Sequence, residues 1–288
     1  MKSKQQIGRE YRAKTLKFLA RVGYATTRQI ARAVFGTCDI SSRKMAGRTI
    51  RSLLALGYLV QKRDGDSVAG EMMLALNRAG VTALAKLVEM PNGRAHARDW
   101  IRHAHKHRTV CNSVFAAVTR GLDEHIGWSE LEIRAGSAPA KLSAYSYKDD
   151  EGTNLLKIPD LLLHGASGPI WVEVENGWRG ARDMQKLIWF LRRIFEHPAP
   201  VVDKVWFVVT APGAKTIGKR LHAALTHRPD SGYAPLRVRA FAGRVACVEI
   251  IDGTCPKRSE HIFFENVPGM ERSAPSRTYD RLSKGLAV

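Results

Sequence analysis

Hydrophobic positions recur at helical spacing through the first third of the chain, and glycines interrupt the pattern. The spacing predicts three helices: one with apolar positions from Ile7 to Ala20 that ends at Gly23, a short one stopped by Gly36, and a third over residues 43–56. Thr26 or Thr27 is expected to cap the second helix, and Ser41 and Ser42 the third, because hydroxyl side chains accept hydrogen bonds from free amides at helix starts. Gly57 is expected to close the third helix in a left-handed conformation.

Beyond Gly57 the period changes from helical to alternating, which predicts a β-hairpin. Its strands cover residues 58–63 and 72–76, around a polar turn at residues 64–66. A further helix is expected from Arg78 to Met90, ahead of Pro91. Three helices followed by a two-stranded wing is the order of a winged helix-turn-helix. We therefore assign residues 1–92 to a winged-helix domain that docks on duplex DNA.

The pattern after a Pro-Asn-Gly boundary predicts a mixed α/β domain over residues 93–252. A helix is expected from Trp100 to Arg120, followed by short apolar runs and two amphipathic helices near residues 179–195 and 215–227. The runs that predict strands cover residues 131–134, 161–164, 170–174, 205–210, 236–242 and 245–251. Residues 253–288 are rich in Pro, Ser, Gly and mixed charge, and we expect them to form a loosely ordered tail.

The net charge of the chain indicates a polyanionic partner. The 288 residues include 46 Lys plus Arg against 27 Asp plus Glu, a net charge of +19. Residues 1–63 hold 15 of these cations and only two acids, Glu10 and Asp39. Cations outside the apolar stripe of the third helix, where a recognition helix meets the major groove and its phosphates, are Arg43, Lys44, Arg48 and Arg51. Lys62 and Arg63 lie where a wing would contact phosphate. The alternative is an ordinary solvated basic face.

Other classes of protein are disfavoured by the same sequence. No apolar run approaches the roughly 20 residues that a membrane-spanning helix needs, and the polar N-terminus lacks the apolar stretch of a signal peptide. The four cysteines have neither metal-ligand nor disulfide spacing, which favours free thiols in a reducing compartment. No nucleotide-binding loop is evident. We therefore expect a cytoplasmic protein whose main partner is double-stranded DNA, without a membrane or a nucleotide.

Acidic residues gather at one predicted hairpin of the second domain. Asp160 opens the first strand, and Glu173 and Glu175 alternate along the returning strand, so these two share a face and Asp160 can lie close to both. Three converging carboxylates form an oxygen-rich site suited to Mg²⁺ or Mn²⁺, which can polarise a phosphate and lower the pKa of an attacking water. The alternative is that Glu173 and Glu175 form the solvent face of a half-buried strand.

Pro159-Asp160, followed thirteen residues after the aspartate by Glu173 on the next strand and then by a helix, resembles the PD-(D/E)xK nuclease motif. The resemblance implies a restriction-endonuclease-like fold, a metal held by Asp160 and Glu173, and a further acid from the segment containing Glu130 and Glu132. The motif's lysine should stand two residues after the second acid, where this chain has Glu175. Either a glutamate serves in that position, or the lysine has moved to the following helix, where Lys186 could reach the site.

The order of these features is similar to that of the replication-relaxation family, which includes MobC-type plasmid mobilisation proteins. The likeness spans about residues 5–225 and includes His107 and Asn112 in a linking helix, a Trp-x-x-x-Glu-x-Arg segment, Pro-Asp and Glu-x-Glu. It implies a mobile-element protein that binds an origin-like site and nicks or relaxes it. Further partners would be a relaxase, a coupling protein or a second copy of the chain.

Two competing classes of function remain open at this point. One is a non-catalytic accessory or regulatory protein of mobilisation or replication, with a degenerate nuclease fold. The other is a toxin-like or defence nuclease, which would cleave without sequence preference.

Two clusters have other interpretations. His103, His107 and Cys111 share one face of the predicted linking helix and could bind a transition metal, although a basic helix side is the plainer interpretation. Tyr145 and Tyr147 lie in a polar segment and are expected in a mobile loop whose exposed rings stack on bases. A nucleophilic tyrosine is the alternative there.

Overall fold

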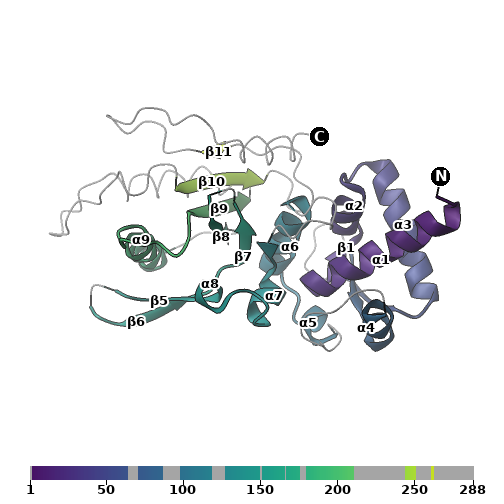
Figure 1. Ribbon diagram of the computed structural model, residues 1–288, viewed down its shortest axis with the longest axis horizontal. Helices are drawn as coiled ribbons and strands as arrows, with labels where there is room; N and C mark the ends of the chain where they lie inside the picture. Colours follow the sequence, from purple (N-terminus) through teal and green to yellow (C-terminus); the bar gives the residue numbers. More distant parts are fainter. Residues whose placement is uncertain are drawn as a thin grey trace. The chain divides into compact units, whose positions relative to one another are not determined.

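The computed structural model divides into two compact units between Ser137 and Ala138 (Figure 1). The first unit therefore extends past residue 92, where the sequence pattern places a boundary. The structure describes residues 2–63, 71–86, 98–118, 127–149, 151–165, 167–175, 180–210, 244–250 and 261–262. The predicted turn at 64–66, the helix at 215–227, the strand at 236–242 and the tail, apart from residues 261–262, lie outside these ranges.

The first unit begins with three helices and a small sheet. The helices are α1 (Lys4–Val22), α2 (Thr27–Phe35) and α3 (Ile40–Ala55). Strand β1 (Ala25–Thr26) precedes α2, and the hairpin of β2 (Leu59–Arg63) and β3 (Met72–Leu76) follows α3. The three strands pair antiparallel in the order β1-β3-β2. The predicted helices and hairpin are confirmed.

Local side chains set where these helices begin. The Thr26 hydroxyl accepts a hydrogen bond from the backbone of Gln29, whose side chain bonds back to Thr26, so α2 has a complete capping box. Gly36 ends the helix in a left-handed conformation. The predicted serine cap of α3 is wrong. The carboxylate of Asp39 is the cap, accepting from the Ser42 amide at 2.7 Å, and the helix starts three residues earlier than predicted.

Among the described residues, the rest of the first unit contains four helices and a two-residue strand. These are α4 (Arg78–Ala85), α5 (Arg98–Arg102), α6 (Lys106–Val118), β4 (Gly127–Trp128) and α7 (Glu130–Arg134). The single helix predicted over 100–120 is interrupted at residues 103–105, so His103 does not share a helix with His107. The strand predicted over 131–134 is wrong as well. This segment is helical because Ser129 and Glu132 form a capping box.

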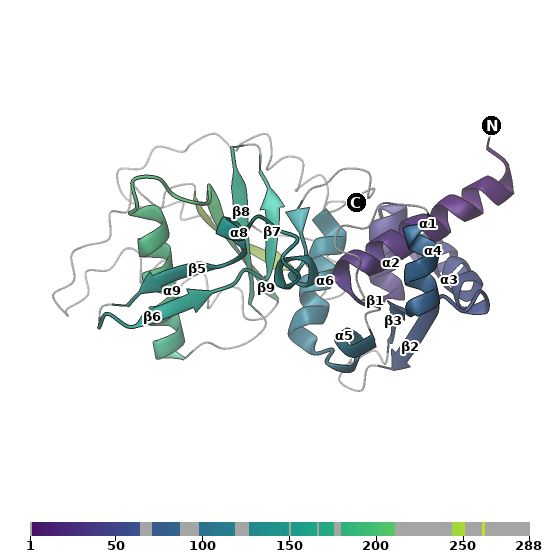
Figure 2. The same cartoon turned by 60° about the horizontal axis from the view of Figure 1, so that its bottom comes forward.

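The second unit holds a mixed sheet with a hairpin and a helix beside it. Short helix α8 (Ala140–Ser143) leads into the antiparallel hairpin of β5 (Tyr145–Lys148) and β6 (Asn154–Lys157). The sheet strands are β7 (Leu161–His164), β8 (Pro169–Glu175), β9 (Lys204–Thr210), β10 (Val245–Ile250) and β11 (His261–Ile262). Helix α9 (Ala181–Phe195) connects β8 to β9. Figure 2 shows the β5–β6 hairpin alongside α9.

Register fixes which side chains of this sheet lie together. Strand β7 pairs antiparallel with β8, β8 pairs parallel with β9, and β9 pairs parallel with β10. Strand β8 is buried along nearly its whole length, as expected for a strand with neighbours on both sides. The apolar side of α9 is also buried, through Leu187, Phe190, Leu191 and Ile194. The fold is thus mixed α/β, as predicted.

Within the described ranges, no helix combines the length and apolarity needed to cross a membrane. Of the cysteines, Cys111 is buried and forms no disulfide, as the sequence predicts. Cys38 is disulfide-bonded, which the cysteine spacing did not predict.

Candidate functional site

A basic surface lies along α3. The four cations predicted for DNA contact line a single hollow of about 430 Å³, together with Ile40 and Gly47. The lining contains no acidic residue and consists, apart from these two, of Arg43, Lys44, Arg48 and Arg51. The opposite face of α3 is buried through Ala46, Ile50 and Leu53. The amphipathic helix therefore anchors itself with one face and presents guanidinium and ammonium groups with the other, and phosphate oxygens are their natural acceptors.

The two cations predicted on the wing are placed differently from each other. Lys62 donates from Nζ to the carbonyl oxygens of Arg102 at 3.1 Å and Ile101 at 3.5 Å. Carbonyls at the end of a helix attract a cation, so Lys62 ties β2 to α5. Arg63 is exposed at the end of β2.

The β7–β8 pairing brings Asp160 to the flank of Glu173. Leu161 is paired with Val172, and the backbone N–H of Asp160 donates to the carbonyl of Val172 at 3.1 Å. The Asp160 Oδ2 atom in turn accepts from the backbone N–H of Val174 at 2.7 Å. Asp160 is thereby held beside the middle of β8, as the sequence predicts from strand alternation.

Glu173 and Glu175 are buried on the same face of β8, with 4% and 5% of their surface exposed. The alternative that they form a solvent face is therefore wrong. Glu173 has a partner for each oxygen: Oε1 accepts from the indole nitrogen of Trp171 at 2.5 Å, and Oε2 lies 2.6 Å from Nζ of Lys157. Glu175 occupies the position where the motif expects lysine.

Burial governs the chemistry of Glu173. Removal from water raises the pKa of this carboxyl above its ordinary value, the ammonium of Lys157 opposes the rise, and the negative charge of Asp160 adds to it. The two carboxylates lie within electrostatic reach of one another because the β7–β8 pairing sets Asp160 beside Glu173. Like charges held close in a buried site favour a proton or a metal cation between them.

Lys157 is the residue that the sequence analysis missed. It ends β6, where the sequence pattern predicted no strand, and its side chain is 18% exposed. Among the described residues, Lys157 is the cation that contacts Glu173, whereas sequence reasoning selected Lys186. The backbone carbonyl of Lys186 accepts a hydrogen bond from the Tyr147 hydroxyl at 3.1 Å. A signal for Lys157 existed in its place three residues before Asp160, but the contact depends on how the hairpin packs.

The two tyrosines of that hairpin pack against α9. Tyr147 is buried, and the Tyr145 hydroxyl donates to the carbonyl of Arg193 at 3.0 Å. Both rings pack on Phe190 of α9, with centroids 6.0 Å and 5.9 Å away. The expectation of a mobile loop with exposed rings is wrong, because these contacts fasten β5 to α9.

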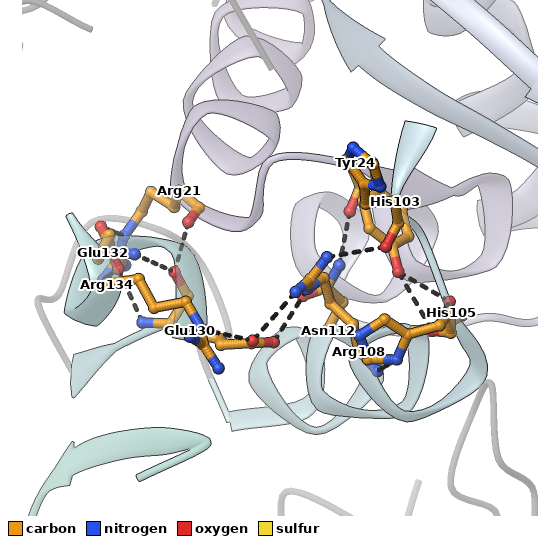
Figure 3. Close-up of polar contacts among 11 residues, drawn as sticks. Arg21, Tyr24, His103, His105, Arg108, Asn112, Glu130, Glu132 and Arg134 are labelled. Atoms are coloured by element: carbon orange, nitrogen blue, oxygen red, sulfur yellow. Dashed lines mark hydrogen bonds and ion pairs between the residues drawn. The ribbon is translucent and has the colours of Figure 1, made fainter. Parts of the chain in front are cut away.

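Glu132, predicted as a further metal ligand, has other partners (Figure 3). Its carboxylate accepts from the Arg21 guanidinium at 2.7 and 3.1 Å, and from the backbone N–H of Ser129 at 2.9 Å. Glu132 belongs to the first unit, whereas Asp160 and Glu173 belong to the second. Its contacts make it a residue that fastens α7 to α1.

A second buried ion pair joins α6 to α7 in the first unit (Figure 3). Arg108 donates to both oxygens of Glu130, at 3.1 and 3.3 Å, and its guanidinium lies 3.7 Å from the ring centroid of Trp100. Asn112 of the same helix donates to the backbone carbonyl of Tyr24 at 2.8 Å. These polar groups join α6 to α5 and α7 and to the segment between α1 and β1, so Asn112 has an architectural role.

Comparison with known proteins agrees with the resemblance stated above. A family model described as Replication-relaxation matches residues 16–182, more than half of the chain. Neither the curated proteins nor the solved structures contain a match.

Proposed function

Because the chain belongs to the replication-relaxation family, we propose that it binds an origin-like duplex site through its first unit and nicks one strand with a divalent metal in its second. The observation that carries the proposal is the placement of Asp160 beside the buried Glu173. A buried and a half-buried carboxylate side by side offer the hard oxygen donors that Mg²⁺ or Mn²⁺ binds in proteins.

The first unit is proposed to be a winged helix. The order α1-β1-α2-α3-β2-β3 and the sheet order β1-β3-β2 support this assignment. Helix α3 would be the recognition helix, since its cations line one hollow without an acidic residue among them. Arg63 would add a phosphate contact from the wing, and Lys62 would position the wing against α5.

The second unit is proposed to be a restriction-endonuclease-like domain of the PD-(D/E)xK kind. The antiparallel β7–β8 pair, the helix after β8 and the parallel return to β9 support it. Asp160 and Glu173 would hold the metal, and Glu175 would line the same face of β8. Glu132 leaves the proposed ligand set because its carboxylate is bonded to Arg21.

The residues present fit such a metal. Their oxygen donors suit a hard cation, and a divalent charge would offset the repulsion between Asp160 and Glu173. A bound Mg²⁺ or Mn²⁺ supplies Lewis-acid polarisation of the phosphate and a more acidic water. In the cleavage step, the water oxygen bonds to phosphorus, the bond from phosphorus to one sugar oxygen breaks, and that oxygen takes up a proton. The step consumes one water molecule and changes no oxidation state, so it needs no oxidant or reductant.

The test is to incubate the purified protein with a supercoiled plasmid that carries the DNA flanking its gene, in the presence of Mg²⁺, Mn²⁺ or EDTA. We expect metal-dependent conversion to open circle, and its loss in Asp160→Asn and Glu173→Gln. Affinity for the same DNA in EDTA should change less than about twofold, because the substitutions lie outside α3. Arg43→Ala is the matched change in the other unit, and it should weaken binding.

A non-catalytic accessory protein is the competing function. It predicts duplex binding without open circle in any of the three conditions, together with normal mobilisation by the two carboxylate variants. That pair of results would replace the nicking proposal. Cleavage of unrelated plasmids at an equal rate would instead favour a nuclease without sequence preference.

A further inference from the structure

The ammonium of Lys157 already occupies one side of the proposed metal ligand Glu173. Its Nζ lies 2.6 Å from Oε2, and only 18% and 5% of the two side chains are exposed. The other oxygen of Glu173 is bonded to Trp171. Any cation that binds Glu173 must therefore compete with a resident positive charge.

We propose that Lys157 is an exchangeable counter-ion, which neutralises Glu173 in the metal-free protein, releases it to a divalent cation and then pairs with the phosphate of the DNA. This inference rests on the proposed function, because it assigns a role at the same site. It also accounts for Glu175 at the lysine position, since the positive charge reaches the site from β6 instead of β8.

The strand next to Lys157 is held by side-chain hydrogen bonds, whereas the lysine side chain itself has a flexible stem. Hydroxyl bonds from Tyr145 and Tyr147 to carbonyls of α9 hold the neighbouring strand β5. Lys157 is the last residue of β6 and is paired with Tyr145. A lysine ammonium is a compact charge on a flexible four-carbon stem, so it can change partner while its backbone stays in place.

In the position where it pairs with Glu173, the ammonium of Lys157 also faces an aromatic ring. The Nζ atom lies 5.4 Å from the centre of the Phe190 ring, within the range of a cation–π contact. Partial exposure of the side chain lets water share the charge during exchange. Release of Glu173 would therefore leave Lys157 with favourable surroundings until a phosphate arrives.

An exchangeable counter-ion and a merely structural ion pair predict opposite effects of neutralising Lys157. Removing a positive charge next to a ligand lowers the repulsion felt by a metal, so Lys157→Gln should bind Mn²⁺ roughly fivefold more tightly or better. The same variant should lose at least about tenfold in nicking rate at saturating Mn²⁺, because one positive charge no longer faces the phosphate. Damage to the fold would lower both quantities together.

Lys157→Arg extends the test and keeps the charge. A guanidinium binds a carboxylate through two parallel hydrogen bonds, so the arginine variant should release Glu173 less readily. Its affinity for Mn²⁺ should therefore be lower than that of the unchanged protein. The matched control is Lys148→Gln, which neutralises an exposed lysine on the other strand of the same hairpin. It should alter neither quantity.

The experiment titrates the full chain and its variants with Mn²⁺, following free Mn²⁺ by electron paramagnetic resonance, and then measures nicking at saturating metal. Tighter binding in Lys157→Gln and weaker binding in Lys157→Arg support the proposal, even if no protein nicks DNA, in which case only the proposed nicking activity fails. Unchanged or weaker binding in Lys157→Gln overturns the proposal, as does the absence of Mn²⁺ binding to the unchanged protein.

Discussion

At the scale of single residues, Gly80 lies so close to the backbone of Tyr58 that no space remains for a side chain at position 80. A Cβ atom at position 80 would lie 2.2 Å from the Tyr58 carbonyl oxygen. The Tyr58 oxygen also accepts from the Asn77 N–H at 3.2 Å, and Asn77 caps α4 by accepting from the Gly80 amide at 2.9 Å. The start of α4 is therefore fitted to the start of the β2–β3 hairpin.

We expect Gly80→Ala to destabilise the protein by about 1–3 kcal/mol, because the methyl group has to displace backbone atoms. Gly8→Ala in α1 is the matched change, since its nearest neighbour would be the flexible end of Arg12 at 3.7 Å. A helical glycine with open space gains about 0.5–1 kcal/mol from alanine. Urea unfolding of both variants measures the difference, and equal effects would contradict the close approach.

The three acidic residues of the candidate site also show which of its features could be predicted from the sequence. Alternation along β8 was enough to place Glu173 and Glu175 on one face, and Pro159-Asp160 was enough to put a third acid beside them. The partner of Glu173 could not be predicted, because Lys157 reaches it only through the packing of a separate hairpin. Burial of both glutamates was also beyond the pattern, since alternating acids commonly face water.

At the scale of elements, the strongest periodic patterns gave correct helices and strands, and the weak ones did not. Helices α1, α2, α3 and α9 and the strand pairs β2–β3 and β7–β8 follow from apolar spacing. The strand prediction for residues 131–134 failed because Leu131 and Ile133 alternate with charged residues, as apolar residues do in a half-buried strand. The Ser129 capping box with Glu132, which decides for a helix, was present in the sequence and should have outweighed them.

Helix α3 carries the element-scale prediction. If its four cations contact phosphates, each alanine substitution should reduce the steepness of log affinity against log salt by about one unit. Arg48→Ala with Arg51→Ala should reduce it by about two. Fluorescence anisotropy with a labelled duplex at several salt concentrations gives this slope.

The control for α3 is Arg78→Ala, which removes an exposed cation from α4, outside the hollow. Its salt slope should equal that of the unchanged protein. If Arg78→Ala also lowered the salt slope by about one unit, DNA affinity would depend on the total charge of the protein, and α3 would not be a specific contact surface.

At the scale of the whole molecule, the first compact unit includes the helices that follow the winged-helix elements. Ile101 is packed in one buried cluster with Tyr24, Met73 and Ala75, and Trp100 lies against it. The Gln29 side chain, at the start of α2, donates to the Thr109 carbonyl and the Ser113 hydroxyl of α6. Cutting the chain at residue 92 would expose these surfaces.

We therefore expect a fragment of residues 1–137 to unfold cooperatively on heating, whereas a fragment of residues 1–92 should melt at a markedly lower temperature or aggregate. The reason is loss of the apolar cluster and of the bonds from Gln29, since exposed apolar area costs about 25 cal/mol per Å². Circular dichroism melts of the two fragments make the comparison. Equal melting temperatures would show that residues 1–92 form the independent folding unit.

The hydrogen bond from Trp171 to Glu173 has an optical consequence. Because this indole is fully buried and bonded to a carboxylate, we expect its fluorescence to change when the charge on that carboxylate changes. The difference between the emission of the unchanged protein and that of Trp171→Phe would isolate this one ring from the other five tryptophans. The protein thus contains a built-in, label-free reporter of events at Glu173, readable in a stopped-flow instrument while DNA is being bound.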